Sequence, residues 1–362
     1  MKIAVVSDVT IGYGSPQVPL LAGSLREHYG AASSVDIIEP AQPELAPRHG
    51  QFPSFTIHRV ATADHPHSPV GRTEYVWRAA KLVNRLKPDV LVISCTYCLP
   101  VLFRLNRRPR KVIYYSIESI PFYGEFDVEM NRKVAPLLDV VIFPEENRAI
   151  LETGRCGFVK VPKLVLYNVS NRKTEAKAPR EAAQRNGRIL YSGTMSMAQT
   201  FLNYYLADDV RALPIDMYGP IKGPASDKQR FLNANPGALR YHGYIDAVSL
   251  AAVRPAYAYS IVAWNPDVEN QLYAAPNKFF ESIADGVPPI AAPHPQCRLI
   301  LERYGCGMLL ENWDYDVFLD ALESAMHLYG GPEWERMVQG CREAVEQELT
   351  WDTQMEKVKP YL

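Results

Sequence analysis

Short apolar runs that alternate with helix-length segments constrain the fold of this chain more than any other feature. Near-continuous apolar runs at 2–8 (KIAVVSD), 89–94 (DVLVIS) and 139–146 (DVVIFPEE) predict strands that are covered on both faces. The segment 73–87 (TEYVWRAAKLVNRLK) has the spacing of a helix with one buried face, and Pro88 ends it. Strands separated by such helices pair in parallel through right-handed crossovers, so the sequence predicts an α/β fold. Further strands are expected at 34–40, 54–60 and 111–119.

The same pattern occurs twice along the chain. It breaks between 168 and 187, where charged and small residues replace the apolar runs, and restarts at 188–193 (RILYSG). A chain of 362 residues also exceeds the usual size of one hydrophobic core. We therefore predict two parallel-sheet domains in tandem, over 1–168 and 188–345, joined by a linker over 169–187. Strands of the second domain are expected at 188–193, 214–220, 239–245, 258–264, 287–293 and 306–311.

Charge and composition exclude several classes of protein. The formal net charge is −1, so no overall field attracts the chain to nucleic acid, and we expect no nucleic-acid partner. No apolar run approaches the roughly 20 residues of a membrane-spanning helix, and the N-terminal apolar stretch is too short for a secretory signal. The six cysteines form no disulfide framework in a chain this long, and Cys95 and Cys98 are expected to be buried, reduced thiols. These features predict a cytoplasmic protein.

The stretch 276–293 (PNKFFESIADGVPPIAAP) carries the strongest signal of a binding site. It predicts a short helix with Lys278 in its first turn, a glycine stop and a buried strand. A positive charge in the first turn is disfavoured by about 0.3–1 kcal/mol, unless a phosphate also binds at the helix N-terminus. Glu281 follows on the same face and has two acceptor oxygens suited to a pair of vicinal hydroxyls. The alternative is an ordinary surface ion pair between the two side chains.

The predicted architecture indicates where a ligand would bind. In parallel α/β sheets, ligands bind outside the carboxyl ends of the strands. With two such domains, the expected site is a cleft between them. The residues that follow the predicted strands are therefore the candidates for binding and catalysis.

Several motifs, in order along the chain, resemble those of glycosyltransferases with the GT-B fold, in particular the large glycosyltransferase group 1 family. The stretch 276–293, followed by CGMLL (306–310), is similar to their donor-nucleotide motif P-x-K-x-x-E, A-x-G-x-P and G-x-L. SDVTIGYGSPQ resembles their glycine-rich acceptor-side loop, LKPDVLVIS a unit of their N-terminal domain, and RILYSGTM and LRYHGYI strands of their donor domain. The last residues, 346–362, resemble the terminal helix that crosses back to the first domain.

The resemblance implies two Rossmann-like domains facing a cleft, an N-terminal acceptor domain and a C-terminal donor-nucleotide domain. The donor would be a nucleoside diphosphate sugar, with UDP or GDP as the nucleotide, and no other cofactor is expected. Glu281 would hold the ribose, and Lys278 would lie by the diphosphate. The other implied site residues are Asn277, Gly193, Thr194 and Tyr244 on the donor side, and Gly12, Tyr13 and Gly14 in the acceptor-side loop.

Two of these implied roles have a physical basis. A glycine turn at Gly193 and Thr194 exposes backbone N–H groups to the phosphates without a Cβ in the way. Tyr244 would flank the base, and simple packing at the strand end is the alternative.

The sequence departs from the family pattern at two places. Tyr273 stands where retaining members usually have the first of two glutamates, and neither an arginine nor a lysine follows the strand 188–193 to clamp the diphosphate. Lys278 would then carry most of the diphosphate charge, with Lys222 as a distant helper. Retaining and inverting transfer both stay open.

An inverting transfer needs a general base that takes the proton of the acceptor hydroxyl. Three acids at the ends of predicted N-terminal strands are candidates for a catalytic role: Glu118, Asp8 and Glu145. Each has the alternative of a helix cap or a salt-bridge partner. The histidines form no ligand cluster and no D-x-D motif stands at a strand end, so no metal is expected.

The run RLNRRPRK (104–111) has five cations in eight positions. A solvated face at a helix end is the usual origin of such a run. The alternative is contact with an anionic membrane surface or with the phosphates of a lipid-linked acceptor, which would bring the protein to the inner face of the membrane.

The sequence therefore predicts a glycosyltransferase that moves a sugar from a nucleoside diphosphate sugar to a hydroxyl acceptor. The acceptor would be a glycan, a lipid-linked molecule or a small molecule. Two other roles on the same fold stay open: a nucleotide-sugar epimerase, and a catalytically inactive partner that binds sugar or nucleotide.

Overall fold

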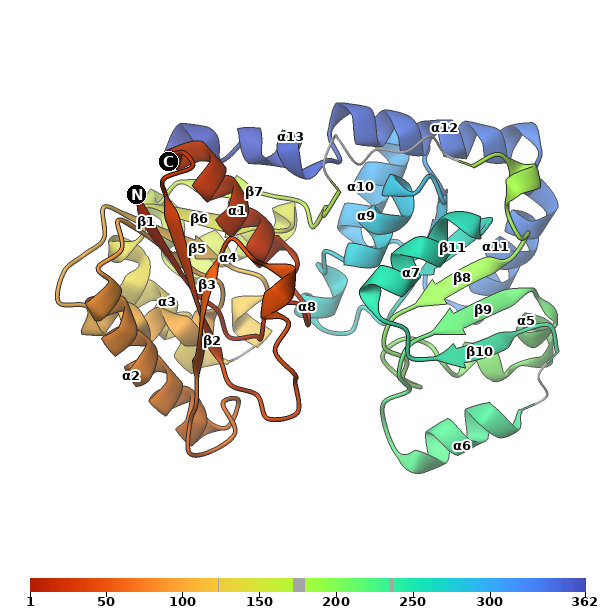
Figure 1. Ribbon diagram of the computed structural model, residues 1–362. Helices are drawn as coiled ribbons and strands as arrows, with labels where there is room; N and C mark the ends of the chain where they lie inside the picture. Colours follow the sequence, from red (N-terminus) through yellow and green to blue (C-terminus); the bar gives the residue numbers. More distant parts are fainter. Residues whose placement is uncertain (123, 172–179, 235–236) are drawn as a thin grey trace. The chain divides into compact units, whose positions relative to one another are not determined.

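The computed structural model describes residues 1–122, 124–171, 180–234 and 237–362, and the chain divides into two compact units (Figure 1). Unit 1 consists of Met1–Ser170 together with Gln354–Leu362, and unit 2 of Asn171–Thr353. The predicted linker, 169–187, lies partly outside the described residues, because these exclude 172–179. The chain thus leaves unit 1 once and returns to it with its last residues.

Unit 1 contains a seven-stranded sheet in the order β3-β2-β1-β4-β5-β6-β7, and every pair in it is parallel. Its strands are β1 (Lys2–Val6), β2 (Ser34–Pro40), β3 (Thr56–Val60), β4 (Val90–Ile93), β5 (Lys111–Tyr115), β6 (Val140–Phe143) and β7 (Lys163–Val165). Its helices are α1 (Gln17–Tyr29), α2 (Pro69–Leu86), α3 (Glu125–Val134) and α4 (Glu146–Arg155), with short 3₁₀ helices η1 (His49–Gln51), η2 (Thr96–Arg104), η3 (Ile120–Phe122), η4 (Ala135–Leu137), η5 (Phe158–Lys160) and η10 (Lys359–Tyr361).

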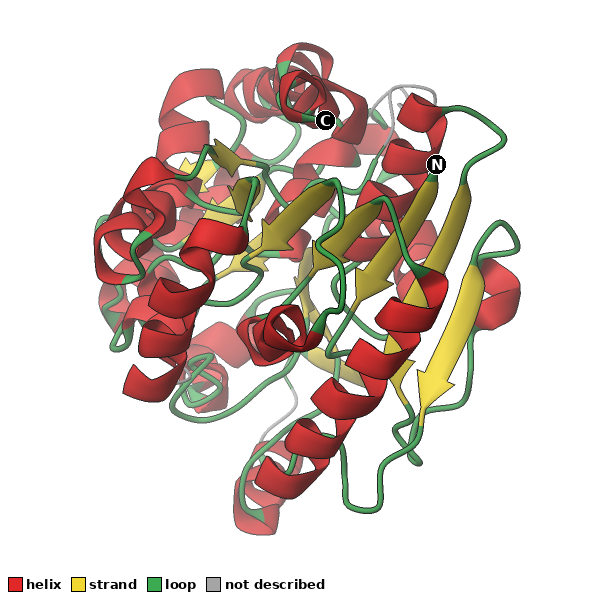
Figure 2. Ribbon diagram, turned by 90° about the vertical axis from the view of Figure 1, so that its left-hand side faces the viewer, coloured by secondary structure: helices red, strands yellow, loops and turns green. Residues whose placement is uncertain are grey.

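Both faces of this sheet are covered (Figure 2). Ala4 and Val6 of β1 lie in one core cluster with the buried side of α2. Ile3 and Val5 point to the opposite face, because side chains alternate along a strand, and they are equally buried. A strand that is covered on both faces needs apolar residues at every position, which explains the near-continuous apolar runs of the sequence.

Unit 2 contains a six-stranded parallel sheet in the order β10-β9-β8-β11-β12-β13. Its strands are β8 (Ile189–Ser192), β9 (Ile215–Tyr218), β10 (Arg240–Gly243), β11 (Tyr259–Val262), β12 (Pro289–Ala291) and β13 (Met308–Leu309). Its helices are α5 (Asp208–Ala212), α6 (Ala225–Asn233), α7 (Ala247–Val253), α8 (Glu269–Leu272), α9 (Asn277–Ala284), α10 (Pro295–Tyr304), α11 (Tyr315–Leu328) and α12 (Pro332–Gln347), with η7 (Ala182–Gln184), η8 (Tyr204–Leu206) and η9 (Arg254–Ala256).

The predicted α/β class with two parallel sheets is confirmed, and each predicted strand is present. β7 was not predicted, and it is only three residues long at the edge of its sheet. Several strands are shorter than predicted. β5, for example, ends at Tyr115 rather than at 119, so that the residues after it form a loop at the carboxyl end of the strand.

The end of the chain packs on unit 1. Helix α13 (Trp351–Glu356) spans the point at which the chain passes from unit 2 to unit 1. The Gln354 side-chain oxygen accepts a hydrogen bond from the Tyr167 N–H at 3.2 Å. The Lys357 ammonium lies 4.8 Å from the centre of the Tyr167 ring. These contacts attach the last residues to the segment that follows β7.

A close approach between two strand ends in unit 2 yields a test of the fold. A Cβ on Gly219 would lie 2.0 Å from the Gly193 carbonyl oxygen, whereas a Cβ on Gly243 would meet nothing within 4 Å; both residues have positive φ. Gly243→Ala should therefore cost only the backbone strain, about 1–3 kcal/mol. Gly219→Ala adds a steric clash of similar size, so its melting temperature should be lower than that of Gly243→Ala by roughly 5 °C. Equal melting temperatures in differential scanning calorimetry would contradict this packing.

Candidate active site

In each unit the parallel strands bring their carboxyl ends to one edge of the sheet, where ligands bind in folds of this class. In unit 1, Asp8 lies just after β1 and Glu118 lies just after β5. The charge of Glu118 acts on the Asp8 carboxyl group, so the structure brings these two predicted residues near each other.

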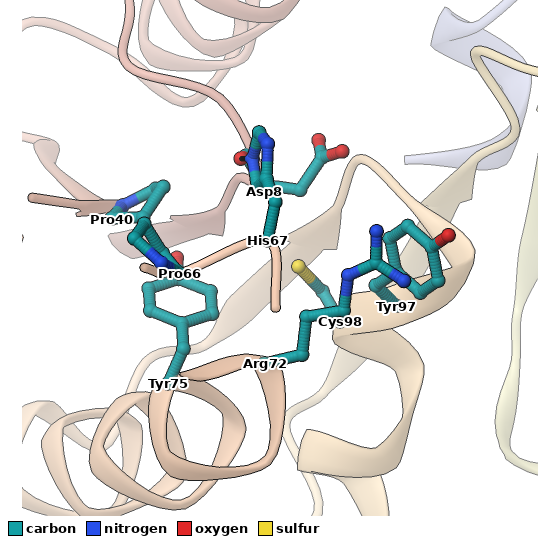
Figure 3. A pocket seen from close by; sticks show the side chains of 8 residues that line it. All are labelled: Asp8, Pro40, Pro66, His67, Arg72, Tyr75, Tyr97 and Cys98. Carbon is teal, nitrogen blue, oxygen red and sulfur yellow. Dashed lines mark hydrogen bonds between the residues drawn. The ribbon is translucent and has the colours of Figure 1, made fainter. Parts of the chain in front are cut away.

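Asp8 lines a small pocket of about 10 Å³, close to the space that one water molecule needs (Figure 3). Burial raises the pKa of the Asp8 carboxyl group, and the charge of Glu118 raises it further, while a hydrogen bond from the Cys95 thiol lowers it. A raised pKa makes a carboxylate a stronger base, which suits proton abstraction from a hydroxyl. The lining residues are Asp8, Pro40, Pro66, His67, Arg72, Tyr75, Tyr97 and Cys98.

Contacts with neighbouring segments hold the walls of this pocket. The Tyr75 hydroxyl lies within hydrogen-bond distance of the backbone oxygens of Ser7 and Ile38, which share its one proton. The guanidinium carbon of Arg72 lies 3.6 Å from the centre of the Tyr97 ring. Figure 3 shows these two side chains next to each other. Both α2 and η2 therefore carry side chains to the end of β1.

A buried ion pair holds the loop that carries Glu118. Arg148 and Glu152 of α4 pair at 3.3 Å, with side chains 2% and 0% exposed. Arg148 also donates to the backbone oxygen of Ile117 at 2.7 Å, and Glu152 accepts from the backbone N–H of Ile120 at 3.3 Å. The pair thus binds the backbone on both sides of Glu118, whose own side chain is exposed.

Glu145, the third acid predicted from the sequence, is a helix cap. Its Oε2 accepts from the Arg148 N–H and its Oε1 from the Asn147 side-chain amide, both at 2.7 Å. The residue is fully buried. Because both oxygens are occupied and the group does not reach the surface, we assign it no part in the chemistry.

The predicted acceptor-side loop is held by Arg48. Its Nη1 donates to the Gly12 oxygen at 2.8 Å, and its guanidinium lies 3.9 Å from the centre of the Tyr13 ring. Gly12 has φ of +86°, a region that favours glycine, and a Cβ there would come within 3.1 Å of Arg48. Gly14 also has positive φ, in open space.

The cationic run 104–111 lies away from this edge. It precedes β5, at the amino end of a strand whose carboxyl end leads to Glu118. Arg108 pairs with Asp139 at 2.9 Å. The run is therefore not brought to the candidate active site. Among the described residues, no helix has the length and apolar character needed to cross a membrane.

In unit 2, helix α9 begins at the corresponding edge and carries Lys278 in its first turn. Pro276 is the N-cap, directly before the first helical residue, Asn277. The Lys278 ammonium lies 4.4 Å from the centre of the Tyr191 ring and 5.7 Å from that of Trp264. Burial lowers the pKa of Lys278 to about 8. Within the described ranges no carboxylate pairs with this ammonium, so the alternative of a Lys278–Glu281 surface pair is not found.

Gly193, at the end of β8, is a neighbour of Lys278. A Cβ on Gly193 would lie 3.9 Å from the lysine Nζ. One part of the prediction needs correction: the Gly193 N–H donates to the Tyr218 oxygen at 2.9 Å, because the strand pairing continues through this residue. It is therefore not available to a phosphate. Thr194 is exposed, and its N–H has no acceptor in the part of the chain that the structure describes.

Glu281, on the next turn of α9, is paired with an arginine rather than with Lys278. Arg254 donates through Nη1 to the Glu281 Oε2 at 2.8 Å and through Nε to the Asp285 Oδ2 at 2.6 Å. The arginine side chain is 7% exposed, whereas the glutamate is 26% exposed. Glu281 thus keeps access to solvent while one of its oxygens is held.

The remaining predicted residues of unit 2 occupy distinct positions. Asn277 is the first residue of α9 and is half-buried. Tyr244 follows β10 and is 70% exposed, so packing at the strand end does not account for it. Tyr273 follows α8, where its N–H donates to the Glu269 oxygen at 3.0 Å.

Several residues at these edges were not found from the sequence. Arg254, Tyr191 and Glu152 carry no motif, and their roles arise from contacts between distant segments. A charged residue inside an otherwise apolar helical stretch, such as Arg254 in LAAVRPAYA, is the one signal that points to a buried ion pair. The described residues contain no group of three or more histidine, cysteine or acidic side chains placed to hold a metal ion.

No family model matches the sequence, and no curated protein matches it. Solved structures do match. Sucrose-phosphate synthase from Thermosynechococcus elongatus is 14% identical over 100% of this chain and 98% of its own, with a TM-score of 0.73. HepE from Anabaena, solved in complex with UDP, is 12% identical over 99% of both chains, with a TM-score of 0.71. The lipopolysaccharide outer core galactosyltransferase WaaB is 11% identical over 100% of this chain and 99% of its own, with a TM-score of 0.67. The chain has the GT-B fold of these proteins, as the sequence predicted.

The low pKa of Lys278 yields a direct test of the site. With a pKa of about 8, the amine should become reactive toward an acylating reagent about two pH units earlier than an ordinary lysine of pKa near 10.4. The measurement is labelling of the full-length protein over pH 6–11, with each lysine followed by mass spectrometry and exposed Lys228 as an internal control for reagent decay. A midpoint near 10.4 for Lys278 would show that its ammonium is not desolvated.

Proposed function

We propose that this chain is a glycosyltransferase that transfers a sugar from a nucleoside diphosphate sugar to a hydroxyl group of an acceptor. One observation carries the proposal: the Lys278 ammonium, which no carboxylate neutralises among the described residues, lies beside the exposed turn of Gly193 and Thr194 at the N-terminus of α9. A desolvated cation, a helix dipole and a free N–H together favour a multiply charged anion. The diphosphate of the donor is such an anion.

Unit 2 would hold the donor through three kinds of contact. Lys278 and the Thr194 N–H bind the diphosphate, Glu281 accepts hydrogen bonds from the ribose hydroxyls, and the exposed Tyr244 ring stacks on the base. The structures of HepE in complex with UDP and with UDP-glucose support UDP as the nucleotide.

Unit 1 would supply the base, and Asp8 is the residue that its geometry favours. The acceptor oxygen attacks the anomeric carbon of the donor while its proton passes to the Asp8 carboxylate. The bond from the anomeric carbon to the diphosphate oxygen breaks, and the diphosphate leaves with the electron pair. Lys278 and the Thr194 N–H stabilise the charge that develops on it.

This step inverts the configuration at the anomeric carbon. Tyr273, which stands in place of the first glutamate of the retaining relatives, supports inversion. The small pocket beside Asp8 admits one hydroxyl-sized group, so the rest of a glycan, lipid-linked or small-molecule acceptor would lie outside it. A product with retained configuration would remove Asp8 from the mechanism and leave the donor site as proposed.

A second candidate is a nucleotide-binding protein without transferase activity. Two observations favour it. Tyr273 stands in place of a glutamate that retaining relatives carry, and the turn after β8 has neither the arginine nor the lysine that the relatives carry there. The two candidates differ in turnover. Release of UDP from a UDP-sugar in the presence of acceptors supports the transferase, whereas binding without release supports the second candidate.

UDP should raise the melting temperature of the full-length protein. At a ligand concentration 100 times Kd, the stabilisation is about 2.7 kcal/mol, or roughly 5–10 °C. Glu281→Ala should remove most of this shift, because the ribose loses its acceptor. Glu302→Ala, which removes an exposed glutamate of α10 paired with Arg298, should leave it unchanged. If UDP, GDP and ADP all leave the melting temperature of the unaltered protein as it is, the proposal fails.

The proposed base predicts two different kinetic effects in unit 1. Asp8→Asn should lower kcat by about 10²–10⁴-fold while UDP affinity is kept. Glu118→Gln should keep turnover. As the pH increases, the rate of this variant should begin to rise at a lower pH than the rate of the unaltered protein. The sign follows because the base acts when deprotonated, and removing the Glu118 charge lowers the pKa of Asp8. Initial rates over pH 4–9 measure both effects; an unchanged kcat for Asp8→Asn excludes it as the base.

A further inference from the structure

A buried arginine, Arg254, contacts Glu281, the carboxylate that is proposed to hold the ribose. Arg254 is the first residue of η9, directly after α7, and its side chain is only 7% exposed. It reaches α9, where its Nε and Nη1 each donate to a different carboxylate. No sequence motif marks this residue.

The two acceptors are spaced one helical turn apart. Glu281 and Asp285 are four positions apart on α9, where like charges repel each other. Arg254 lies between them, with contacts of 2.8 Å to Glu281 and 2.6 Å to Asp285. A guanidinium suits this position because its donors form a rigid planar fork and it stays charged when buried. Its charge also offsets the negative charge that Glu281 would present to a nearby diphosphate.

The pairing leaves the glutamate in a defined orientation. Arg254 holds Oε2 of Glu281, whereas Oε1 has no hydrogen-bond partner among the residues that the structure describes. The Glu281 side chain is still 26% exposed, so a ligand can reach it. A carboxylate fixed at one oxygen loses little further rotational freedom when the other accepts a hydrogen bond.

The contact also joins two elements that would flank the nucleoside. Helix α7 begins next to Asp246, which caps it through hydrogen bonds to the N–H groups of Val248 and Ser249. Tyr244, proposed to stack on the base, lies just before this cap, and Arg254 follows the end of the same helix. The arginine therefore links the helix that follows the base-side residue to the helix that carries the ribose-side residue.

We propose that Arg254 is a positioning residue that orients Glu281 toward the ribose 2′-hydroxyl, and so gives the site its preference for ribonucleotides over 2′-deoxyribonucleotides. The inference rests on the proposed function, since it takes Glu281 as the acceptor for the ribose. It goes beyond that function by assigning the origin of sugar selectivity to a residue that does not itself touch the ligand.

The test compares the affinities of UDP and 2′-deoxy-UDP by isothermal titration calorimetry on the full-length protein. The unaltered protein should prefer UDP by about tenfold, the effect of one hydrogen bond to a charged group. R254Q should reduce the preference to less than about threefold, because Glu281 is no longer held. D285N is the matched control: it removes the negative charge of the other acceptor, leaves the Arg254–Glu281 contact, and should keep the tenfold preference.

The outcomes separate this inference from the proposed function. If R254Q lowers the melting temperature but keeps the preference, or if D285N loses the preference as fully as R254Q, Arg254 has a merely structural role and the inference is overturned. If the unaltered protein binds neither nucleotide, the proposed function fails and the inference fails with it. Should R254Q not fold, R254K takes its place, because lysine keeps the charge without the fork. A preference reduced at least twofold in R254K supports the inference, and an unchanged one overturns it.

Discussion

A desolvated ammonium at the positive end of a helix is the interaction on which the candidate active site depends. Two other cations of unit 2 are paired with carboxylates: Arg254 lies between Glu281 and Asp285, and Arg188 pairs with Asp216 at 2.8 Å. Lys278 has aromatic neighbours instead, and burial lowers its pKa to about 8. Its charged form is therefore under-stabilised in the free protein, and an anion at the start of α9 relieves the cost. This imbalance is the physical reason for expecting a phosphate group at this edge of the sheet.

Buried ion pairs give the strand-end loops the rigidity that the sheets do not provide. Within a few residues beyond the carboxyl end of a parallel strand, the backbone stops pairing with the neighbouring strand. In unit 1 the Arg148–Glu152 pair binds the backbone around Glu118. In unit 2 Arg254 joins the end of α7 to Glu281. Removing one member of such a buried pair typically costs about 3–5 kcal/mol. Both units therefore depend on these contacts for the positions of carboxylates that solvent reaches.

The fold was predictable because strands covered on both faces need apolar residues throughout, and β1 and β4 show that pattern plainly. Lys278 could be proposed as an anion site from the sequence alone, because its position within one helix decides its electrostatics. What the sequence did not reveal depends on contacts between distant segments. The Gly193 N–H is occupied by Tyr218 of a neighbouring strand, Glu145 is buried as a cap, and the partner of Glu281 lies 27 positions before it in the chain. Local patterns do not encode such pairings.

The most direct measurement is a crystal structure of the full-length protein soaked with UDP. The account predicts diphosphate oxygens within about 3.2 Å of both the Lys278 Nζ and the Thr194 N–H, and ribose hydroxyls at the same distance from Glu281. Nucleotide bound at a different edge of the sheet, or a diphosphate that makes no contact with Lys278, would contradict it.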